Sequence, residues 1–165
     1  MNLKVTEIAK ALGTNLDSDN IIDNVSIDSR NVSETTLFFA IKGDRFDGHD
    51  FVKDVAEKGV GAVVCHKKVD CNAPVIYVED TKKAFLQFAN HYRNSIEGLR
   101  VIGLTGSVGK TSTKDFVYTA LSPFAQTVRS LGNHNNEIGM PQTIFGFAKD
   151  DKFAILEMGM DHIME

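Results

Sequence analysis

The sequence predicts an α/β protein with parallel strands, built of two successive parts. Short apolar runs of strand length alternate with segments whose apolar residues recur at helical spacing. Gly98 separates a first part with short strands from a second part with longer strand–helix units. The residues from 155 to 165 do not have the pattern expected at the end of a fold. We therefore expect a small α/β domain over residues 1–98 and the first portion of a truncated parallel-sheet domain over 99–165.

The composition of the 165 residues excludes several classes of protein. Hydrophobic residues make up 42% of the chain, which excludes a wholly disordered protein. No apolar run reaches the roughly 18 residues that a membrane helix needs, and the start at Met1 lacks the pattern of a secretory signal. The net charge of −4 comes without the basic stripe that would indicate nucleic-acid binding. Cys65 and Cys71 form neither a disulfide framework nor a zinc site, so we expect a cytoplasmic protein with reduced thiols, without membrane insertion or nucleic-acid partners.

The elements expected in the first part are short and are bounded by glycine or polar residues. In chain order they are a helix over 6–12, strands over 25–27 and 37–41, a helix over 50–59, strands over 62–65 and 75–78, and a helix over 81–94. Gly13 and Gly59 are expected to end the first two helices, as glycine does at many helix ends. Asp50 and Asp80 are the expected N-caps of the second and third helices.

The second part predicts a strand–helix–strand–helix–strand order. Its elements are a strand over 100–104, a helix over 110–121, a strand over 126–129, a helix over 137–145 and a strand over 153–156. Pro141 is compatible with the second helix if it lies in the first turn. This alternation implies right-handed crossovers and a parallel sheet, with Glu157 at the carboxyl end of the last strand.

The most informative segment is the glycine-containing loop between the first strand and helix of the second part. It reads Thr-Gly-Ser-Val-Gly-Lys-Thr, and it comprises Thr105, Gly106, Ser107, Val108, Gly109, Lys110 and Thr111, with Ser112 following. Glycines let backbone N–H groups point at phosphate oxygens, and the helix N-terminus adds a positive end. Lys110 can reach the β and γ phosphates, and the Thr111 hydroxyl can ligate the Mg²⁺ that bridges them. Leu104 stands where the strict phosphate-loop pattern has a glycine, so a chance strand–helix turn stays the alternative.

Polar residues near the ends of the later strands are further candidates. Glu157 stands where metal-binding carboxylates lie in such folds, so Thr111 and Glu157 are the expected Mg²⁺ ligands. Asn135 and Asn136 can bind a nucleotide or a metal-bound water, and His162 can orient a phosphate or carboxylate. Each of these residue types also has an ordinary use, as a solvated strand end, a helix cap or an exposed loop histidine.

These motifs together resemble the Mur ligases of peptidoglycan synthesis. The resemblance rests on the phosphate loop, on Gly-Asn-His-Asn-Asn-Glu-Ile-Gly-Met-Pro over 132–141, and on Leu-Glu-Met-Gly-Met-Asp-His over 156–162. It extends from Val25 to Glu165, and the family's own phosphate loop also lacks the first glycine. Within the family, the motifs resemble those of the member that joins D-alanyl-D-alanine to UDP-MurNAc-tripeptide.

The resemblance also implies a binding site for the uridine diphosphate end of the substrate in the first part. Asp-Ser-Arg over 28–30 and the turn over 42–49 are similar to the family's small N-terminal domain. The residues implied to face the nucleotide-sugar are Ser29, Arg30, Lys42, Gly43, Asp47 and His49. An ordinary β-turn explains Gly43-Asp44 and Asp47-Gly48 equally well.

The chemistry implied by the resemblance is ATP-dependent ligation through an acyl phosphate. Lys110 and His162 are then expected to act at the transferring phosphoryl group, with ATP and Mg²⁺ as cofactors. Because the family's enzymes are longer, we expect the 165 residues to be a fragment that is inactive alone. Two alternatives stay open: another amide ligase of the same superfamily, and a non-catalytic nucleotide-binding module derived from a Mur ligase.

Overall fold

The computed structural model describes residues 1–132 and 135–159. The chain divides into two compact units, Met1–His91 and Tyr92–Glu165. The division falls inside helix α3 (Thr81–Asn94), a few residues before Gly98. Tyr92, in the last turn of α3, donates a hydrogen bond of 2.6 Å to the backbone carbonyl of Phe147, which ties this turn to the second unit. The functional domains 1–98 and 99–165 stay a prediction.

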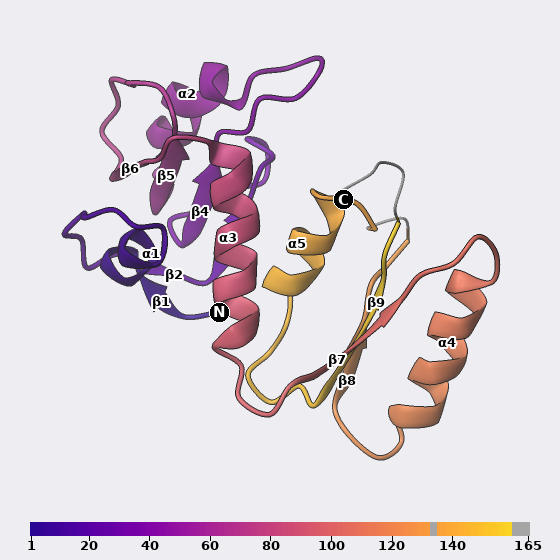
Figure 1. The fold of residues 1–165 in the computed structure, drawn as a ribbon. Coiled ribbons are helices and arrows are strands. Elements are labelled where there is room, and N and C mark those ends of the chain that lie inside the picture. Colours follow the sequence, from indigo (N-terminus) through magenta and orange to yellow (C-terminus); the bar gives the residue numbers. More distant parts are fainter. Residues whose placement is uncertain (133–134, 160–165) are drawn as a thin grey trace. The chain divides into compact units, whose positions relative to one another are not determined.

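The first unit contains a four-stranded parallel sheet (Figure 1). Its elements before α3 are β1 (Leu3–Lys4), α1 (Val5–Ala11), β2 (Ile21–Ile22), β3 (Asn24–Ser26), β4 (Thr36–Phe39), the 3-10 helix η1 (Gly48–Phe51), α2 (Val52–Glu57), β5 (Ala62–Cys65) and β6 (Val75–Tyr77). The sheet order is β3-β4-β5-β6, and each neighbouring pair is parallel. The carboxyl ends of all four strands therefore meet at one edge of the sheet.

Helices α2 and α3 cover opposite faces of this sheet. Successive strand residues point to opposite faces, and Phe38 and Phe39 of β4 are both fully buried. Phe38 packs with Val52 and other apolar residues in the core on the α2 side. The ring of Phe39 lies 5.1 Å from that of Phe85 in α3, in an edge-to-face arrangement. Two adjacent phenylalanines of β4 thus pack against different helices, one on each face of the sheet.

Two details of the first unit differ from the sequence prediction. Asp50 is not the cap of α2: the chain enters α2 through η1, whose cap is Asp47, which accepts a hydrogen bond from the backbone N–H of His49. The helical segment starts at η1, before Asp50, because the Asp47 carboxylate accepts the backbone N–H of His49, which has no partner within the helix. The antiparallel pair β1–β2 was not expected from the sequence, since two-residue strands are too short to show an alternating pattern.

The second unit contains a three-stranded parallel sheet in the order β7-β9-β8. Its elements are β7 (Arg100–Leu104), α4 (Lys110–Leu121), β8 (Thr127–Arg129), α5 (Gly139–Phe145) and β9 (Phe153–Glu157). Pro141 is the third residue of α5 and so lies in its first turn, as predicted. Because β9 is the central strand, Glu157 at its end lies between the strands that carry the loops after β7 and β8.

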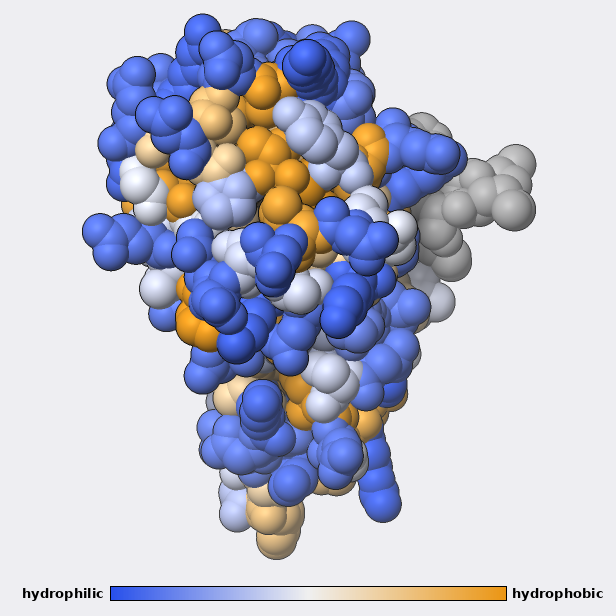
Figure 2. Space-filling model, turned by 90° about the vertical axis from the view of Figure 1, so that its left-hand side faces the viewer, coloured by the Kyte–Doolittle hydropathy of each residue, from blue (hydrophilic) through white to orange (hydrophobic). Residues whose placement is uncertain are grey.

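The surface is mainly hydrophilic on the face that Figure 2 shows, with hydrophobic residues visible between hydrophilic ones. Among the described residues, the exposed large apolar side chains of the second unit are Val108, Phe116, Phe124 and Leu131. No helix in residues 1–132 and 135–159 has the length and apolar character needed to cross a membrane.

Candidate active site and its relatives

The loop between β7 and α4 has the backbone of a phosphate-binding turn. Gly106 has a φ of +152° and Gly109 a φ of +77°, a region that residues with a Cβ rarely adopt. Gly109 directly precedes α4 as its N-cap. The structure therefore brings Thr105 to Ser112 together as one loop and helix start, most of whose residues are exposed. This is the local geometry that the sequence predicts for an anion site at a helix N-terminus.

Lys110 folds back over the loop. Its Nζ donates a hydrogen bond of 2.6 Å to the backbone carbonyl of Gly106. An ammonium group has three N–H donors, so this contact leaves two for an incoming anion. The position of Lys110 agrees with the role predicted for a phosphate-loop lysine, which itself stays a prediction.

A buried polar cluster lies beside the loop, at the carboxyl end of β9. The Thr111 hydroxyl donates to Oε2 of Glu157 over 3.0 Å, and Lys114 Nζ lies 3.2 Å from the same oxygen. The backbone N–H of Glu157 donates to the Ser130 hydroxyl at 3.0 Å. The side chains of Lys114 and Glu157 are 4% and 8% exposed. Thr111 and Glu157, predicted together as metal ligands, therefore do lie side by side.

Lys114 and Ser130 were missed from the sequence. A lysine within a helix is usually exposed to solvent, so the residue type gives no reason to expect a buried Lys114. A signal does exist, because Lys114 follows Thr111 by three positions and so shares its helix face. Ser130 directly follows β8, at the edge of the sheet where sites of parallel α/β folds are found.

The loop before α5 is also joined to the end of β9. The backbone N–H of Gly159 donates to the Asn135 carbonyl at 2.9 Å, so Asn135 lies close to the cluster around Glu157. Oδ1 of Asn136 accepts hydrogen bonds from the backbone N–H groups of Ile138 and Gly139, so Asn136 holds the turn that leads into α5. A nucleotide contact for either asparagine stays a prediction. The predicted catalytic His162 lies outside the described residues.

The donor chemistry of Thr111 and Glu157 fits Mg²⁺. A hydroxyl and a carboxylate are hard oxygen ligands, and Mg²⁺ usually takes one or two carboxylates together with phosphate oxygens and waters. Within residues 1–132 and 135–159, no three His, Cys, Asp or Glu side chains cluster so that they could hold a metal by themselves.

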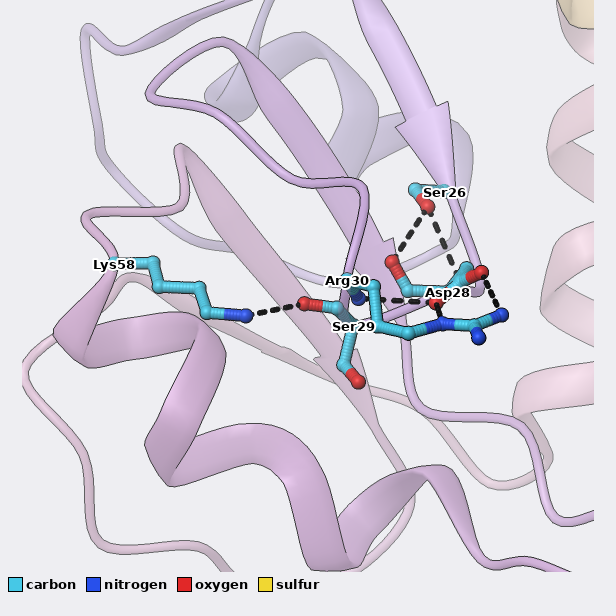
Figure 3. A network of polar contacts seen from close by, with 5 residues as sticks. All are labelled: Ser26, Asp28, Ser29, Arg30 and Lys58. Carbon is cyan, nitrogen blue, oxygen red and sulfur yellow. Dashed lines mark hydrogen bonds and ion pairs between the residues drawn. The ribbon is translucent and has the colours of Figure 1, made fainter.

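A second group of predicted site residues lies after β3, in the first unit. The Arg30 guanidinium forms two hydrogen bonds with the Asp28 carboxylate, of 2.9 and 2.7 Å (Figure 3). These contacts and the Arg30 N–H lower the pKa of Asp28 to about 2. Lys58 donates to the Ser29 carbonyl at 2.8 Å, while the Ser29 hydroxyl points away from the network (Figure 3). The paired hydrogen bonds between Asp28 and Arg30 thus hold the turn, and the Ser29 hydroxyl takes no part in this network.

The turn over 42–49 is held together by Asp47. Its Oδ1 lies 2.6 Å from Nδ1 of His49, and its Oδ2 pairs with Lys67. The His49 side chain is only 5% exposed, and its Nε2 accepts the backbone N–H of His66 at 3.2 Å. The structure therefore brings Asp47 and His49 together inside the turn, and leaves Lys42 and Gly43 exposed on it. Contact of these four residues with a nucleotide-sugar stays a prediction.

A pocket of about 250 Å³ opens at the carboxyl edge of the four-stranded sheet. Its lining residues come from the segments after β4, β5 and β6: Lys42, His66, Glu79, Asp80, Thr81 and Lys82. Burial lowers the pKa of His66 below its ordinary value. Lys42 alone was predicted as a site residue. His66 could have been found from its position directly after a parallel strand, and the other lining residues from the short connection between β6 and α3 and the first turn of α3, where ligands bind in open α/β sheets.

Comparisons with known proteins agree between sequence and structure. The chain matches the family model described as Mur ligase family, catalytic domain, over residues 21–93, and the Mur ligase middle domain over residues 104–165. It is 42% identical over 143 residues to the UDP-N-acetylmuramoyl-tripeptide–D-alanyl-D-alanine ligase of Bacillus subtilis, an alignment that covers 85% of this chain and 31% of that protein. The ligase of the same name from Escherichia coli is 37% identical over 145 residues, covering 88% and 32%.

Solved structures show the same likeness. A UDP-N-acetylmuramoylalanyl-D-glutamyl-2,6-diaminopimelate–D-alanyl-D-alanyl ligase from Acinetobacter baumannii superimposes with a TM-score of 0.92 at 30% identity, covering 100% of this chain and 38% of that one. MurF ligase from Thermotoga maritima in complex with ADP gives a TM-score of 0.75 at 32% identity, covering 82% and 31%. The chain spans about a third of the length of the curated relatives it matches. Two family models, the curated sequence relatives and the solved structures agree, so this chain belongs to the Mur ligase family.

Proposed function

We propose that this chain is part of an ATP-dependent ligase of peptidoglycan precursor synthesis that joins D-alanyl-D-alanine to UDP-MurNAc-tripeptide. Relatives at 37% to 42% identity carry that name, which supports the proposal. Residues 1–98 then hold the nucleotide-sugar, and residues 99–165 form the first part of the ATP-binding domain. The proposed location is the bacterial cytoplasm, where ATP is available and thiols such as those of Cys65 and Cys71 stay reduced.

The observation that carries the proposal is the contact between Thr111 and Glu157 beside the phosphate loop. Lys110 and the backbone of Thr105 to Ser112 are the proposed contacts to the phosphates of ATP. Thr111 and Glu157 are the proposed Mg²⁺ ligands, and Asn135 lies close enough to face the same nucleotide. Mg²⁺, when bound, offsets the charge of the phosphates so that a carboxylate can approach them. The relative from Thermotoga maritima was solved with ADP, which supports a nucleotide here.

The nucleotide-sugar site is proposed at the carboxyl edge of β3, β4, β5 and β6. The turn with Ser29 and Arg30, the exposed Lys42 and Gly43, and the pocket beside His66 all lie at that edge. Asp47 and His49 act there by holding the turn over 42–49 in shape. Lysine and arginine side chains suit the negative charge of a diphosphate.

The proposed reaction has two steps. The terminal carboxylate of UDP-MurNAc-tripeptide attacks the γ-phosphorus of ATP, which forms an acyl phosphate and releases ADP. The amine of D-alanyl-D-alanine then attacks the acyl carbon, phosphate leaves, and the amine loses a proton as the amide forms. Lys110 and His162 are proposed to act at the phosphoryl group during the first step.

Binding of a fluorescent ATP analogue in the presence of Mg²⁺ tests the nucleotide half. Lys110→Ala is expected to weaken binding about tenfold or more, since a hydrogen bond to a charged group contributes roughly 1.5–3 kcal/mol. Lys149→Ala, at an exposed lysine of the same unit, is the matched control and should bind as the unaltered chain does. Equal affinities in all three proteins would contradict the assignment of Lys110.

Calorimetric titration with UDP-MurNAc-tripeptide, and with folate as a comparison, tests the nucleotide-sugar half. We expect UDP-MurNAc-tripeptide to bind and folate not to bind. Binding of folate would favour another amide ligase of the superfamily. Binding of ATP with neither second ligand would favour a nucleotide-binding module without this reaction.

A further inference from the structure

Lys114 is a charged residue enclosed in the second unit, and the phosphate-loop chemistry does not use it directly. Its side chain is 4% exposed, whereas charged side chains are rarely buried unless they are paired. Lys110, one helical turn earlier, has a different partner: it donates to the backbone carbonyl of Gly106 in the loop. The two lysines of α4 therefore face different groups, and only Lys114 reaches Glu157.

The contacts of Glu157 are unequal between its two carboxylate oxygens. Thr111 Oγ1 at 3.0 Å and Lys114 Nζ at 3.2 Å both bind Oε2. Among the described residues, no side chain forms a hydrogen bond with Oε1 of Glu157. The backbone of Glu157 is also held, because its N–H donates to the buried Ser130. One oxygen of the carboxylate is thus occupied, and the main chain that carries it is anchored.

A buried ion pair is a poor means of stabilising a fold. The cost of taking both charges out of water commonly equals or exceeds their attraction, and an apolar pair of similar size often serves as well. The desolvation cost of the buried pair between Lys114 and Glu157 has a purpose if Lys114 orients the Glu157 carboxylate toward a ligand. In metal sites, residues that bind the ligating side chain set its orientation and tune the metal.

We infer that Lys114 is a positioning residue that makes Glu157 a one-oxygen ligand and so favours Mg²⁺ over Ca²⁺ in the nucleotide complex. Holding Oε2 leaves Oε1 alone for the metal. Mg²⁺ requires compact octahedral geometry, whereas Ca²⁺ accepts six to eight oxygens and often takes both oxygens of one carboxylate. This inference rests on the proposed function, because it assumes that a metal–nucleotide complex binds beside Glu157.

The test compares two metals within each protein. The affinity of residues 1–165 for fluorescently labelled ADP is measured with MgCl₂, with CaCl₂ and with EDTA. The unaltered chain is expected to bind ADP about tenfold more tightly with Mg²⁺ than with Ca²⁺. In Lys114→Met, this ratio should fall toward one, because only the Thr111 hydroxyl then holds Oε2 and the carboxylate can turn both oxygens to the metal more easily.

The ratio separates positioning from other effects of the substitution. Removing a positive charge changes the attraction for both divalent cations in the same direction, and a general loss of structure weakens both complexes alike. Lys114→Arg, which keeps a donor for Oε2, should restore the preference for Mg²⁺. Lys110→Met is the matched control on α4 and should weaken both complexes with an unchanged ratio.

The outcomes distinguish the two proposals. If the unaltered chain binds ADP with neither metal, the proposed function fails. If it binds ADP equally well with both metals, the inference about Lys114 fails, and this measurement needs no variant to fold. An unchanged ratio in a folded Lys114→Met protein also overturns the inference while leaving the nucleotide site in place.

Discussion

The hydroxyl of Thr111 donates a hydrogen bond of 3.0 Å to Oε2 of Glu157, which is 46 positions later in the chain. Thr111 lies in the first turn of α4, and Glu157 ends the central strand β9. A hydroxyl that donates its proton keeps its lone pairs free to face a cation. The bond therefore holds both oxygen-bearing side chains beside the predicted phosphate loop.

Thr111→Val is expected to weaken ADP binding about tenfold with Mg²⁺ and much less in EDTA. Valine keeps the shape of the side chain but removes the oxygen that is the proposed ligand, together with its bond to Glu157. Thr111→Ser, which keeps the hydroxyl, is the matched control and should retain most of the affinity for the Mg²⁺ complex. Titration of labelled ADP in both buffers measures the effect. A loss of equal size in EDTA would show that Thr111 does not act through the metal.

Gly48→Ala is expected to destabilise the first unit by about 1–3 kcal/mol. A Cβ at Gly48 would lie 2.7 Å from the backbone nitrogen and 2.8 Å from the carbonyl oxygen of Ile41, too close for either to stay in place. Because this moves the turn over 42–49, the affinity for UDP-MurNAc-tripeptide should fall as well. Denaturant unfolding and calorimetric titration measure the two effects.

The matched control for that substitution is Gly43→Ala in the same turn. Its Cβ would meet only the carbonyl oxygen of Phe46, at an ordinary distance of 3.6 Å. Stability close to that of the unaltered chain is expected. Similar losses in the two variants would mean that the contact between Gly48 and Ile41 does not limit the turn.

Asp47 should make the stability of the first unit depend on pH in the acid range. The Lys67 side chain, with the N–H and ring of His49, holds the pKa of Asp47 well below its usual range, although burial acts in the opposite direction. A pKa lower in the folded than in the unfolded state gives stability that is full above pH of about 4 and is lost as the pH falls further. Asp47→Asn should therefore be destabilised at pH 7, and its difference from the unaltered chain should shrink below pH of about 4.

Urea unfolding at a series of pH values, followed by amide exchange of the first unit, measures that dependence. Asp50→Asn, at an exposed carboxylate of the adjoining η1, serves as the comparison and should leave the acid profile unchanged. A difference between Asp47→Asn and the unaltered chain that stays constant with pH would show that Asp47 acts through packing alone.

Tyr92→Phe is expected to destabilise the second unit by about 1–3 kcal/mol, because it leaves the Phe147 carbonyl without its partner. The hydroxyl donates to that carbonyl over 2.6 Å, and Tyr92 is 1% exposed. Tyr77→Phe is the control, since its hydroxyl forms longer bonds with Val69 and the residue is 46% exposed. Amide exchange near Phe147 reports the change. Equal effects of the two substitutions would contradict a special role for Tyr92.

Much of the fold could be predicted because the chain is locally consistent. The predicted strands over 62–65 and 100–104 and the predicted helices over 81–94 and 110–121 coincide with β5, β7, α3 and α4. Each of these four elements has at least one clear local signal: a run or regular spacing of apolar residues, a capping residue, or a glycine next to its end. The ribbon of β1 and β2 and the early start of η1 were missed, because they depend on pairing between distant residues and on one carboxylate contact.

The candidate site divides in the same way. Gly106, Gly109, Lys110 and Thr111 could be found from the sequence because a phosphate loop requires contiguous residues with defined backbone angles. Lys114, Ser130 and His66 were missed, since the contacts that single them out come from segments far away in the chain, and their positions in the sequence are weaker signals than a contiguous motif.

The sequence by itself determined the parallel α/β class and the resemblance to Mur ligases, and it located the glycine-containing loop that we predict to bind phosphate, because these depend on periodicity and on contiguous motifs. Only the tertiary structure decided that β9 lies in the centre of its sheet, with Glu157 beside Thr111 and a buried Lys114 on one of its oxygens. It also decided that Asp47 and His49 face each other within their turn. The physical reason is that burial and charge pairing depend on which distant segments meet, and sheet order rather than local spacing sets those meetings.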